Sequence, residues 1–234
     1  MDRVGVPYQR DRVAVVQSGF MRDVYNWMAL GLAVTAISSL YTASSRTMLE
    51  LIFGNPVVLI VLIVGELGLV VAISAAINRI KSTTALMMFF IYSLLNGLTL
   101  SAIFIVYTST SIANTFFVTA GTFATMSVYG YTTRRDLTSL GSFLMMGLFG
   151  IIIASVVNFF LRSEQIYWLI TYAGVIIFVG LTAYDTQKIK QMAVAGFEGA
   201  EMERKGAVMG ALMLYLDFIN LFLLLLRIFG RRNN

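Results

Sequence analysis

Apolar stretches long enough to cross a lipid bilayer repeat along the whole chain, and they constrain its fold more than any other feature. About 20 apolar helical residues span the hydrocarbon core, where backbone polar groups must be paired within the helix. Of the 234 residues, 58% are hydrophobic and 12% are charged, whereas soluble proteins carry about 25% charged residues. The sequence therefore predicts an all-α membrane protein, a bundle of seven transmembrane helices at residues 25–43, 56–77, 85–107, 112–131, 141–161, 166–186 and 207–228.

One transmembrane domain, at residues 24–230, accounts for all these stretches. Residues 1–23 alternate in charge and lack a long apolar core, so they are interpreted as a partly disordered cytoplasmic tail and not as a cleavable signal peptide. Residues 231–234 form a C-terminal tail. The only long connection, at about 187–206, is rich in Gly and Glu, which predicts a mobile loop.

The positions of Lys and Arg indicate how the chain is oriented. Most of them fall in the N-terminal tail and in the loops after the second, fourth and sixth stretches, which share one side of the membrane. The loops on the other side contain only Arg46 and Arg162. The positive-inside rule then places the N-terminus in the cytoplasm and the C-terminus outside. Arg231 and Arg232 argue against an external C-terminus, because the rule places basic residues inside. A re-entrant or tilted last segment is therefore the alternative.

Cysteine and histidine are both absent, which excludes several kinds of chemistry. No thiol nucleophile, disulfide or imidazole base is available, and zinc would find only carboxylate ligands. A pH response near neutrality must come from carboxylates, because histidine is the usual switch in that range. The net charge of +5 is scattered over short loops, so membrane orientation explains it better than nucleic-acid binding.

Two aspartates stand in the last two apolar stretches: Asp185 closes the sixth, and Asp217 lies about 15 Å into the seventh. An ionised carboxylate near the bilayer centre costs roughly 2.5–3.5 kcal/mol on insertion scales. Small and polar residues share one face of the last stretch, and such a face must meet protein or water. The seventh helix is therefore predicted to be central, with this face made of Gly206, Gly210, Met213, Asp217, Asn220, Leu224 and Arg227.

The two aspartates can meet only if the sixth helix continues past Asp185 or the seventh begins later than drawn. Close carboxylates repel, and such a pair titrates as a unit. This chemistry fits a pH-sensitive latch or a site for a hard cation, although two carboxylates are too few to bind Ca²⁺ tightly. A purely structural pair that fixes helix packing is the alternative. Apart from weakly held Ca²⁺ at Asp185 and Asp217, no metal or cofactor is expected.

Three further charges complete the candidate site. Glu66 in the second stretch and Arg227 near the outer end of the seventh lie at similar depth, so we expect an ion pair between them. Arg79, at the cytoplasmic end of the second stretch, is a candidate partner for Asp185 or Asp217. A structural role in helix packing is the alternative for Glu66 and Arg227.

The segments 214–222 and 226–230 resemble the Bax inhibitor-1 (TMBIM) family, and so do residues 184–187 and Glu66. The likeness extends over essentially all seven stretches. Residues 105–108 and 129–132 point to its bacterial inner-membrane branch, the YbhL-like proteins.

This resemblance implies a seven-helix bundle with the last helix in the centre and a pH-dependent calcium leak through the membrane. In that picture Asp185 and Asp217 match paired aspartates that sense pH. Glu66 and Arg227 match a polar contact that helps close the pore, with Asn220 on the same polar face. Arg79 stands two residues from the position of a family arginine.

The expected function is therefore a pH-sensitive leak channel for calcium or another cation, gated by a paired-aspartate latch. A non-conducting regulator is the alternative, in which residues 1–23 bind another membrane protein such as a quality-control protease. Intramembrane aspartyl proteases carry Gly-x-Gly before one aspartate and a Pro-Ala-Leu element. Leu-Tyr-Leu precedes Asp217, and the only prolines are Pro7 and Pro56, so no enzymatic activity is expected. The expected partners are the lipid bilayer and the cation, and not nucleic acid.

Overall fold

The structure is a computed structural model that describes residues 5–233, with side chains from Gln17 onward. These residues form no strand, and their only isolated β-bridge joins Tyr107 to Arg232. The all-α prediction is confirmed. Within the described part the helices are α1 (Gly5–Ser44), α2 (Arg46–Phe53), α3 (Pro56–Ala76), α4 (Ser82–Leu100), α5 (Ala102–Val106), α6 (Ser109–Thr132), α7 (Thr138–Leu161), α8 (Glu164–Ala195) and α9 (Ala200–Phe229).

Six segments of the described chain are long and apolar enough to cross a membrane. The predicted stretch 112–131 falls on α6, which is a full-length helix but is rich in Thr and Gly and does not reach the same apolar content. The predicted count of seven spans is therefore not confirmed. The six are Gln17–Ser44, Pro56–Ala76, Ser82–Val106, Thr138–Leu161, Glu164–Ala195 and Ala200–Phe229.

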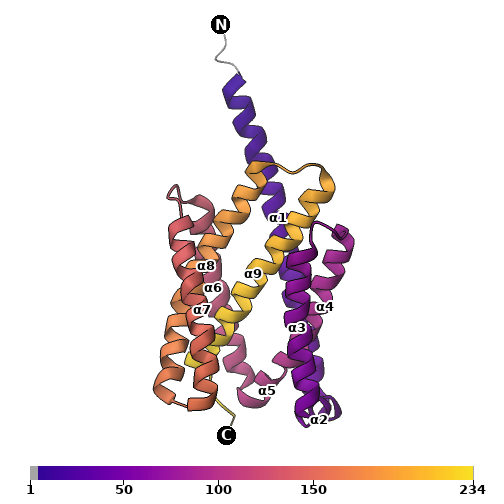
Figure 1. The fold of residues 1–234 in the computed structure, drawn as a ribbon, viewed down its shortest axis with the longest axis vertical. Helices are drawn as coiled ribbons and strands as arrows, with labels where there is room; N and C mark the ends of the chain where they lie inside the picture. Colours follow the sequence, from indigo (N-terminus) through magenta and orange to yellow (C-terminus); the bar gives the residue numbers. More distant parts are fainter. Residues whose placement is uncertain (1–4, 234) are drawn as a thin grey trace. The chain divides into compact units, whose positions relative to one another are not determined.

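The chain divides into two compact units, and α8 and α9 each contribute residues to both. Figure 1 labels the helices and colours them in chain order. The first unit contains the chain up to Ala102 together with Ile189–Tyr215. The second contains Ile103–Lys188 and the chain from Leu216 onward. The most apolar window of α9 is 72% buried, more than that of any other candidate span. This burial agrees with an enclosed helix, while the central position of α9 among all the others stays a prediction.

The stretch interpreted as a tail is helical from Gly5 onward, because α1 runs without a break from Gly5 to Ser44. Pro7 stands in the first turn, where its missing N–H removes no intrahelical hydrogen bond. The rest of α1, up to Ser44, contains no further proline. Helix is therefore present from Gly5 where a partly disordered tail was expected, and residues 1–4 lie outside the described part.

The loop expected at 187–206 is mostly helix. Helix α8 continues to Ala195 and α9 begins at Ala200, so only residues 196–199 connect them. Gly196 and Gly199 have φ angles of 80° and 94°, in the left-handed region that glycine adopts without a steric penalty. Lys, Gln, Met, Ala and Glu dominate the flanking residues and are good helix formers, so charge alone did not end either helix.

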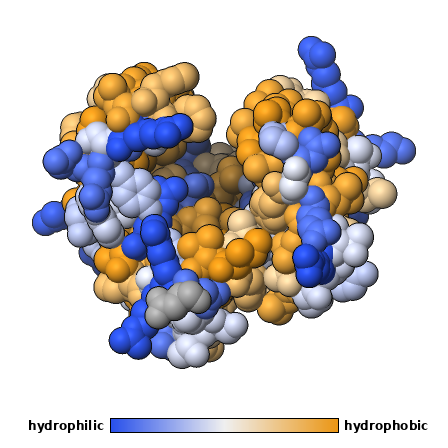
Figure 2. Space-filling view, turned by 90° about the horizontal axis from the view of Figure 1, so that it is seen from below, coloured by the Kyte–Doolittle hydropathy of each residue, from blue (hydrophilic) through white to orange (hydrophobic). Residues whose placement is uncertain are grey.

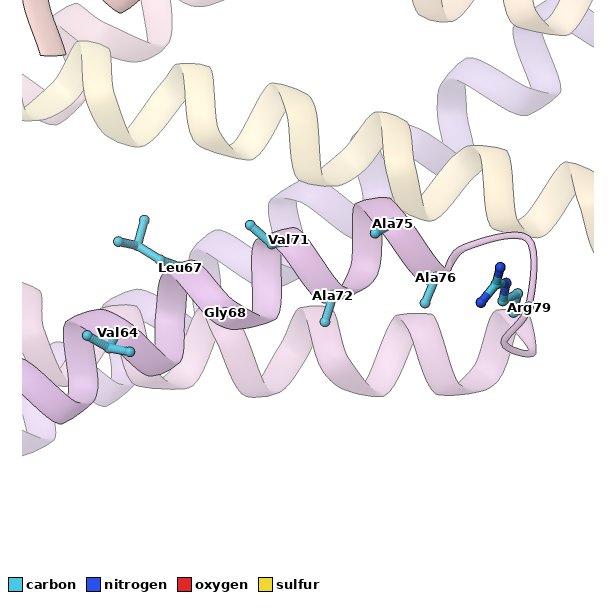
Figure 3. Close-up of a pocket in the computed structure, with 8 residues that line it drawn as sticks. All are labelled: Val64, Leu67, Gly68, Val71, Ala72, Ala75, Ala76 and Arg79. Carbon is cyan, nitrogen blue, oxygen red and sulfur yellow. The ribbon is translucent and has the colours of Figure 1, made fainter. Parts of the chain in front are cut away.

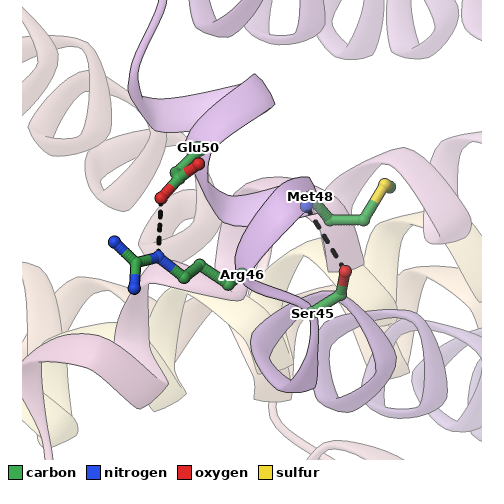
Figure 4. A network of polar contacts seen from close by, with 4 residues as sticks. All are labelled: Ser45, Arg46, Met48 and Glu50. Atoms are coloured by element: carbon green, nitrogen blue, oxygen red, sulfur yellow. Dashed lines mark hydrogen bonds and ion pairs between the residues drawn. The ribbon is translucent and has the colours of Figure 1, made fainter.

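Helix α2 is short and follows α1 directly. It was not predicted from the sequence. Its N-cap, Ser45, accepts a hydrogen bond from the backbone N–H of Met48 at 3.4 Å (Figure 4). Arg46 and Glu50 form an ion pair at 2.7 Å, one helical turn apart. Both side chains are exposed, so the pair adds little stability. The buried Ile52 is the apolar anchor of this helix.

The core of the second unit is an apolar cluster between α7, α8 and α9. Leu221 is completely buried, and Gly174 on α8 lies directly under Leu224. The absence of a side chain at Gly174 lets the two helices approach closely. This packing sets the separation of α8 and α9 near the aspartates, and its buried members are Leu144, Ile177, Phe178, Leu181, Leu221, Leu224 and Leu225.

Candidate functional site

Asp185 on α8 and Asp217 on α9 form a hydrogen bond with each other in the second unit. They meet because α8 continues past Asp185 for ten more residues, to Ala195, which is the first of the two conditions stated above. Asp217 is buried, with 4% of its surface exposed, and Asp185 is partly buried. A hydrogen bond between two carboxyl groups needs a donor, and an ionised carboxylate has none. The pair in this arrangement therefore holds at least one proton.

One oxygen of the pair has no partner. Among the described residues, the buried side-chain atoms without a hydrogen bond are Ser39 Oγ, Thr42 Oγ1 and Asp217 Oδ2. An unsatisfied buried polar atom costs roughly 1–3 kcal/mol, so Asp217 Oδ2 is an acceptor with unused binding capacity. Among the described residues, no three acidic, His or Cys side chains lie close enough together to hold a metal ion. The arrangement thus offers a cation few ligands.

Helix α6 supports the segment of α8 that carries Asp185. Gly130 packs against the backbone of Ala183, which brings the two helices into direct contact. The hydroxyl of Thr186, the residue after Asp185, reaches Ser127 Oγ at 3.5 Å. Asp185 is therefore flanked on both sides by α8 residues whose positions α6 determines.

Gln187 ties the same segment to the loop between α6 and α7. Its Oε1 accepts a hydrogen bond from the Leu137 N–H at 2.9 Å, and its Nε2 donates to the Arg135 carbonyl at 2.8 Å. Both ends of this buried amide are thus satisfied. The loop residues are held by a side chain two positions after Asp185, so a movement of α8 here would also displace the loop.

Lys188 is the cation that acts on the pair within this unit. It follows Asp185 by three residues, lies 5.9 Å from the centre of the Tyr184 ring and attracts the Asp185 carboxylate electrostatically. The predicted partner was Arg79, and Lys188 was not predicted. The signal was present, because residues three apart on a helix are neighbours. It was overlooked because the sixth helix was drawn to end at 186.

The predicted ion pair between Glu66 and Arg227 joins residues of different units and stays a prediction. Within the first unit, Glu66 accepts a hydrogen bond from Thr99 Oγ1 at 2.9 Å. Within the second, the guanidinium carbon of Arg227 lies 5.3 Å from the centre of the Tyr167 ring. Each side chain thus has a partner in its own unit.

Arg79 belongs to the first unit and the two aspartates to the second, so their proposed pairing also stays a prediction. Arg79 lies just beyond α3, where its backbone N–H donates to the Ala76 carbonyl. It stands at the end of a groove along α3 (Figure 3). The groove is otherwise apolar, lined by Val64, Leu67, Gly68, Val71, Ala72, Ala75 and Ala76.

Asn220, predicted as a pore contact, directs its amide to its own helix. Its Nδ2 donates to the Leu216 carbonyl at 2.8 Å. This bond satisfies the amide nitrogen locally and makes no link to another helix. A role of Asn220 in a pore stays a prediction.

A buried polar network in the first unit was also missed. Tyr215 is fully buried on α9, and its hydroxyl lies 2.6 Å from Thr35 Oγ1 on α1. Thr35 also donates to the Ser93 carbonyl on α4 at 2.8 Å. The Tyr215 ring packs edge-on against Phe89 and Tyr92. The sequence signal was a hydroxyl-bearing residue inside an apolar run, which does not reveal its partner.

Comparisons with known proteins all point to one family. The model of the family described as "Inhibitor of apoptosis-promoting Bax1" matches residues 17–234. The "Inner membrane protein YbhL" of Escherichia coli K12 is 55% identical over 91% of this chain and 92% of its own length. An uncharacterised protein of Borreliella burgdorferi is 48% identical over 97% of both chains. A helical membrane architecture, a family model over nearly the whole chain and these identities lead to one conclusion: the chain belongs to the Bax inhibitor-1 family.

Proposed function

We propose that this protein is a pH-sensitive leak channel for Ca²⁺ or another cation in the bacterial inner membrane, with Asp185 and Asp217 as its latch. The observation that supports the proposal is the hydrogen bond between these two carboxyl groups in a buried position. The unpaired Oδ2 of Asp217 adds an oxygen ligand suited to a hard cation. A relative named an inner membrane protein supports the location.

The shared proton supplies the closing force. While it is present, it joins α8 to α9 through the carboxyl pair. When it is lost, two like charges at about 4 Å repel by roughly 4 kcal/mol at an effective dielectric constant of 20. About 1.4 kcal/mol changes an equilibrium tenfold, so this repulsion can shift a closed-to-open equilibrium by roughly a thousandfold. Lys188 is then positioned to hold the Asp185 carboxylate apart from Asp217.

Helix α9 provides the connection between the latch and the first unit. It runs from Ala200 to Phe229 and contributes residues to both units, so a displacement at Asp217 is carried along a continuous helix. In this proposal Glu66, Arg227, Arg79 and Asn220 line or close the path. The N-terminus lies in the cytoplasm, as the distribution of basic residues predicts.

Flux measurements in proteoliposomes test the proposal. Vesicles loaded with a calcium-sensitive dye would carry the wild type, Asp185→Asn, Asp217→Asn or, as a control with the same chemical change, the exposed Asp23→Asn. We expect wild-type and Asp23→Asn flux to rise with pH between about 6 and 8. The two latch variants should lose this dependence, because an amide forms the interhelix bond without titrating. Unchanged pH profiles in both latch variants would rule out the pair as the gate.

The regulator hypothesis is the alternative, with residues 1–23 as the segment that would bind another membrane protein. A deletion of residues 1–16 spares Phe20, which packs on Phe197 at 5.0 Å between ring centres. If the deletion abolished a cellular phenotype and the wild type conducted no cation in vesicles, the regulator would be the better account.

A further inference from the structure

A polar pocket of about 330 Å³ lies in the second unit, where the turn between α7 and α8 meets the C-terminal residues. Its size falls within the roughly 300–1,000 Å³ of small-molecule sites. Two arginines, Arg162 and Arg232, line it together with the aromatic residues Tyr167 and Trp168. Figure 2 views the end of the molecule that carries the C-terminus and shows hydrophilic residues gathered beside apolar surface.

Arg162 adopts an unusual backbone conformation at this pocket. Its φ of 52° is the only positive φ of a non-glycine residue in the described chain. Such a conformation costs of order 1–3 kcal/mol and persists only when the surroundings enforce it. Asn158 does so, accepting from the Arg162 N–H at 2.8 Å through its carbonyl and from the Ser163 N–H at 2.9 Å through Oδ1. Glycine would adopt this conformation without the steric cost.

Backbone hydrogen bonds between the C-terminal residues and residues 106–108, which connect α5 to α6, hold Arg232 in place. The Thr108 N–H donates to the Arg231 carbonyl at 3.0 Å, and the Asn233 N–H donates to the Val106 carbonyl at 2.9 Å. These bonds flank the bridge between Tyr107 and Arg232. A fixed backbone lowers the entropy that Arg232 loses on binding a ligand.

The pocket carries an excess of positive charge. Within the described residues of the second unit, neither Arg162 nor Arg232 forms an ion pair with a carboxylate, although Glu164 also lines the pocket. The third guanidinium, of Arg227, packs over the Tyr167 ring that forms one wall.

An anion with several oxygens fits these donors best. A guanidinium presents two parallel N–H groups that match the spacing of phosphate oxygens, so two arginines can hold one phosphate in a defined orientation. The long helix α8 begins at Glu164, and its positive end adds to the same field. We propose that this pocket binds the phosphate of a phospholipid headgroup.

The position in the membrane favours a lipid over a soluble phosphate. The pocket lies where the candidate spans of α7 and α8 meet, at Leu161 and Glu164, which is the depth of headgroups. Phe159 and Phe160, each 77% exposed, offer apolar surface to acyl chains beside it. Trp168 stacks on Tyr172 with ring centres 5.7 Å apart, an aromatic pair typical of the interface.

This site is separate from the aspartate latch. Asp185 lies 21 residues after Glu164 on α8, which corresponds to about 30 Å of helix. The proposal does not depend on cation flux, so it stands or falls without the leak channel.

The emission of Trp168 reports binding directly. The only other tryptophan is Trp27, so the detergent-purified full-length protein with Trp27→Phe has a single tryptophan, at the pocket, which can be excited selectively over the tyrosines. We would titrate it with short-chain phosphatidylglycerol and, separately, with glycerol 3-phosphate and inorganic phosphate. We expect saturable binding of the lipid. The soluble phosphates should bind far more weakly, because they lack the acyl chains. Equal binding of lipid and soluble phosphate would overturn the lipid assignment.

Variants of the two arginines test the pocket. Arg232→Gln and Arg162→Gln should each weaken lipid binding by roughly tenfold or more, as expected for the loss of a charged hydrogen bond. Arg162→Lys keeps the charge without the fork and should also bind more weakly while remaining folded. Arg231→Gln removes the same charge from the adjacent position, whose side chain lines a different cavity with Ser111 and Phe229, and should bind as the parent does. Arginine variants with the affinity of Arg231→Gln would overturn the proposal.

Discussion

Gly130 on α6 lies so close to Ala183 on α8 that the Ala183 carbonyl stands where a Cβ atom at Gly130 would be. The contact is made two residues before Asp185. Backbone atoms cannot move aside as a flexible side chain can, so the position excludes any residue larger than glycine. Helix α6 therefore helps to determine where the aspartate pair sits.

A methyl group at position 130 should force α6 and α8 apart. We expect Gly130→Ala to reduce stability by about 1–3 kcal/mol, the usual cost of overpacking. Gly121→Ala is a matched control on the same helix, because nothing lies within 4 Å of its added Cβ. It should be neutral or slightly stabilising, since alanine is the better helix former. Thermal unfolding in detergent would compare them, and equal melting temperatures would contradict the close approach.

The Thr35–Tyr215 hydrogen bond gives a second prediction. Thr35→Val removes a buried hydroxyl that bonds Tyr215 and the carbonyls of Gly31 and Ser93, and it should cost about 1–3 kcal/mol. Tyr215→Phe should cost less, about 0.5–1.5 kcal/mol, because Thr35 keeps the Ser93 carbonyl as an acceptor. The double variant should lose less stability than the sum of the two single losses, since both single substitutions remove the same Thr35–Tyr215 hydrogen bond. Denaturant unfolding would measure all three, and strictly additive losses would show that the two hydroxyls do not interact.

Glu201 on α9 caps the first turn of α4. Its two carboxylate oxygens accept from the Ser82 N–H at 2.6 Å and from Ser82 Oγ at 2.8 Å. The N-cap residue itself, Lys81, makes no side-chain cap bond. We expect Glu201→Ala to speed amide hydrogen exchange in the first turn of α4, because a capping acceptor is lost. Glu203→Ala, two residues along the same helix, should leave the exchange unchanged. If both variants behaved alike, Glu201 would have no capping role.

Asp136 makes the start of α7 sensitive to acid. Hydrogen bonds from Thr138 Oγ1 at 2.6 Å and from the Thr138 N–H at 2.9 Å hold the pKa of Asp136 below its usual range. A lowered pKa stabilises the folded state above the unfolded value of about 3.9, and this stabilisation is lost as the pH falls through the folded pKa.

Hydrogen exchange at the first turn of α7 would measure this effect. After correction for the intrinsic pH dependence of exchange, its protection in the wild type should decrease as the pH is lowered below about 4. In Asp136→Asn the protection should be independent of pH in that window, because the amide does not titrate. A pH dependence that persisted in this variant would assign the effect to another group.

The sequence by itself determined the helices and most of their positions in the chain. The second predicted span, 56–77, agrees with α3 at Pro56–Ala76, because Asn55 and Pro56 mark a helix start locally. A helix in a bilayer satisfies its own backbone, so apolar length alone predicts it. The family was also recognisable, since it rests on motifs of adjacent residues.

The ends of the last two long helices needed more than local reasoning. Charged residues after 186 predicted a loop, but a helix can project beyond the bilayer and carry charge at no cost. This error hid Lys188 and left the meeting of Asp185 with Asp217 undecided. Helix α6 was predicted at the right place, but its apolar content is too low for a candidate span. Its Thr and Gly residues lower the hydropathy, and one of them, Gly130, allows close packing against α8.

Only the tertiary structure decided which polar groups become partners. Asp185 bonds Asp217, Thr35 meets Tyr215, and Glu201 caps Ser82 across 119 residues of sequence. Such pairs depend on the distance between helices. That distance is set by side chains that interdigitate and by glycines, whose lack of a side chain lets two helices approach closely. A one-dimensional pattern records which face of a helix is polar. It does not record which neighbour that face meets, because the packing that places the neighbour involves residues far away in the chain.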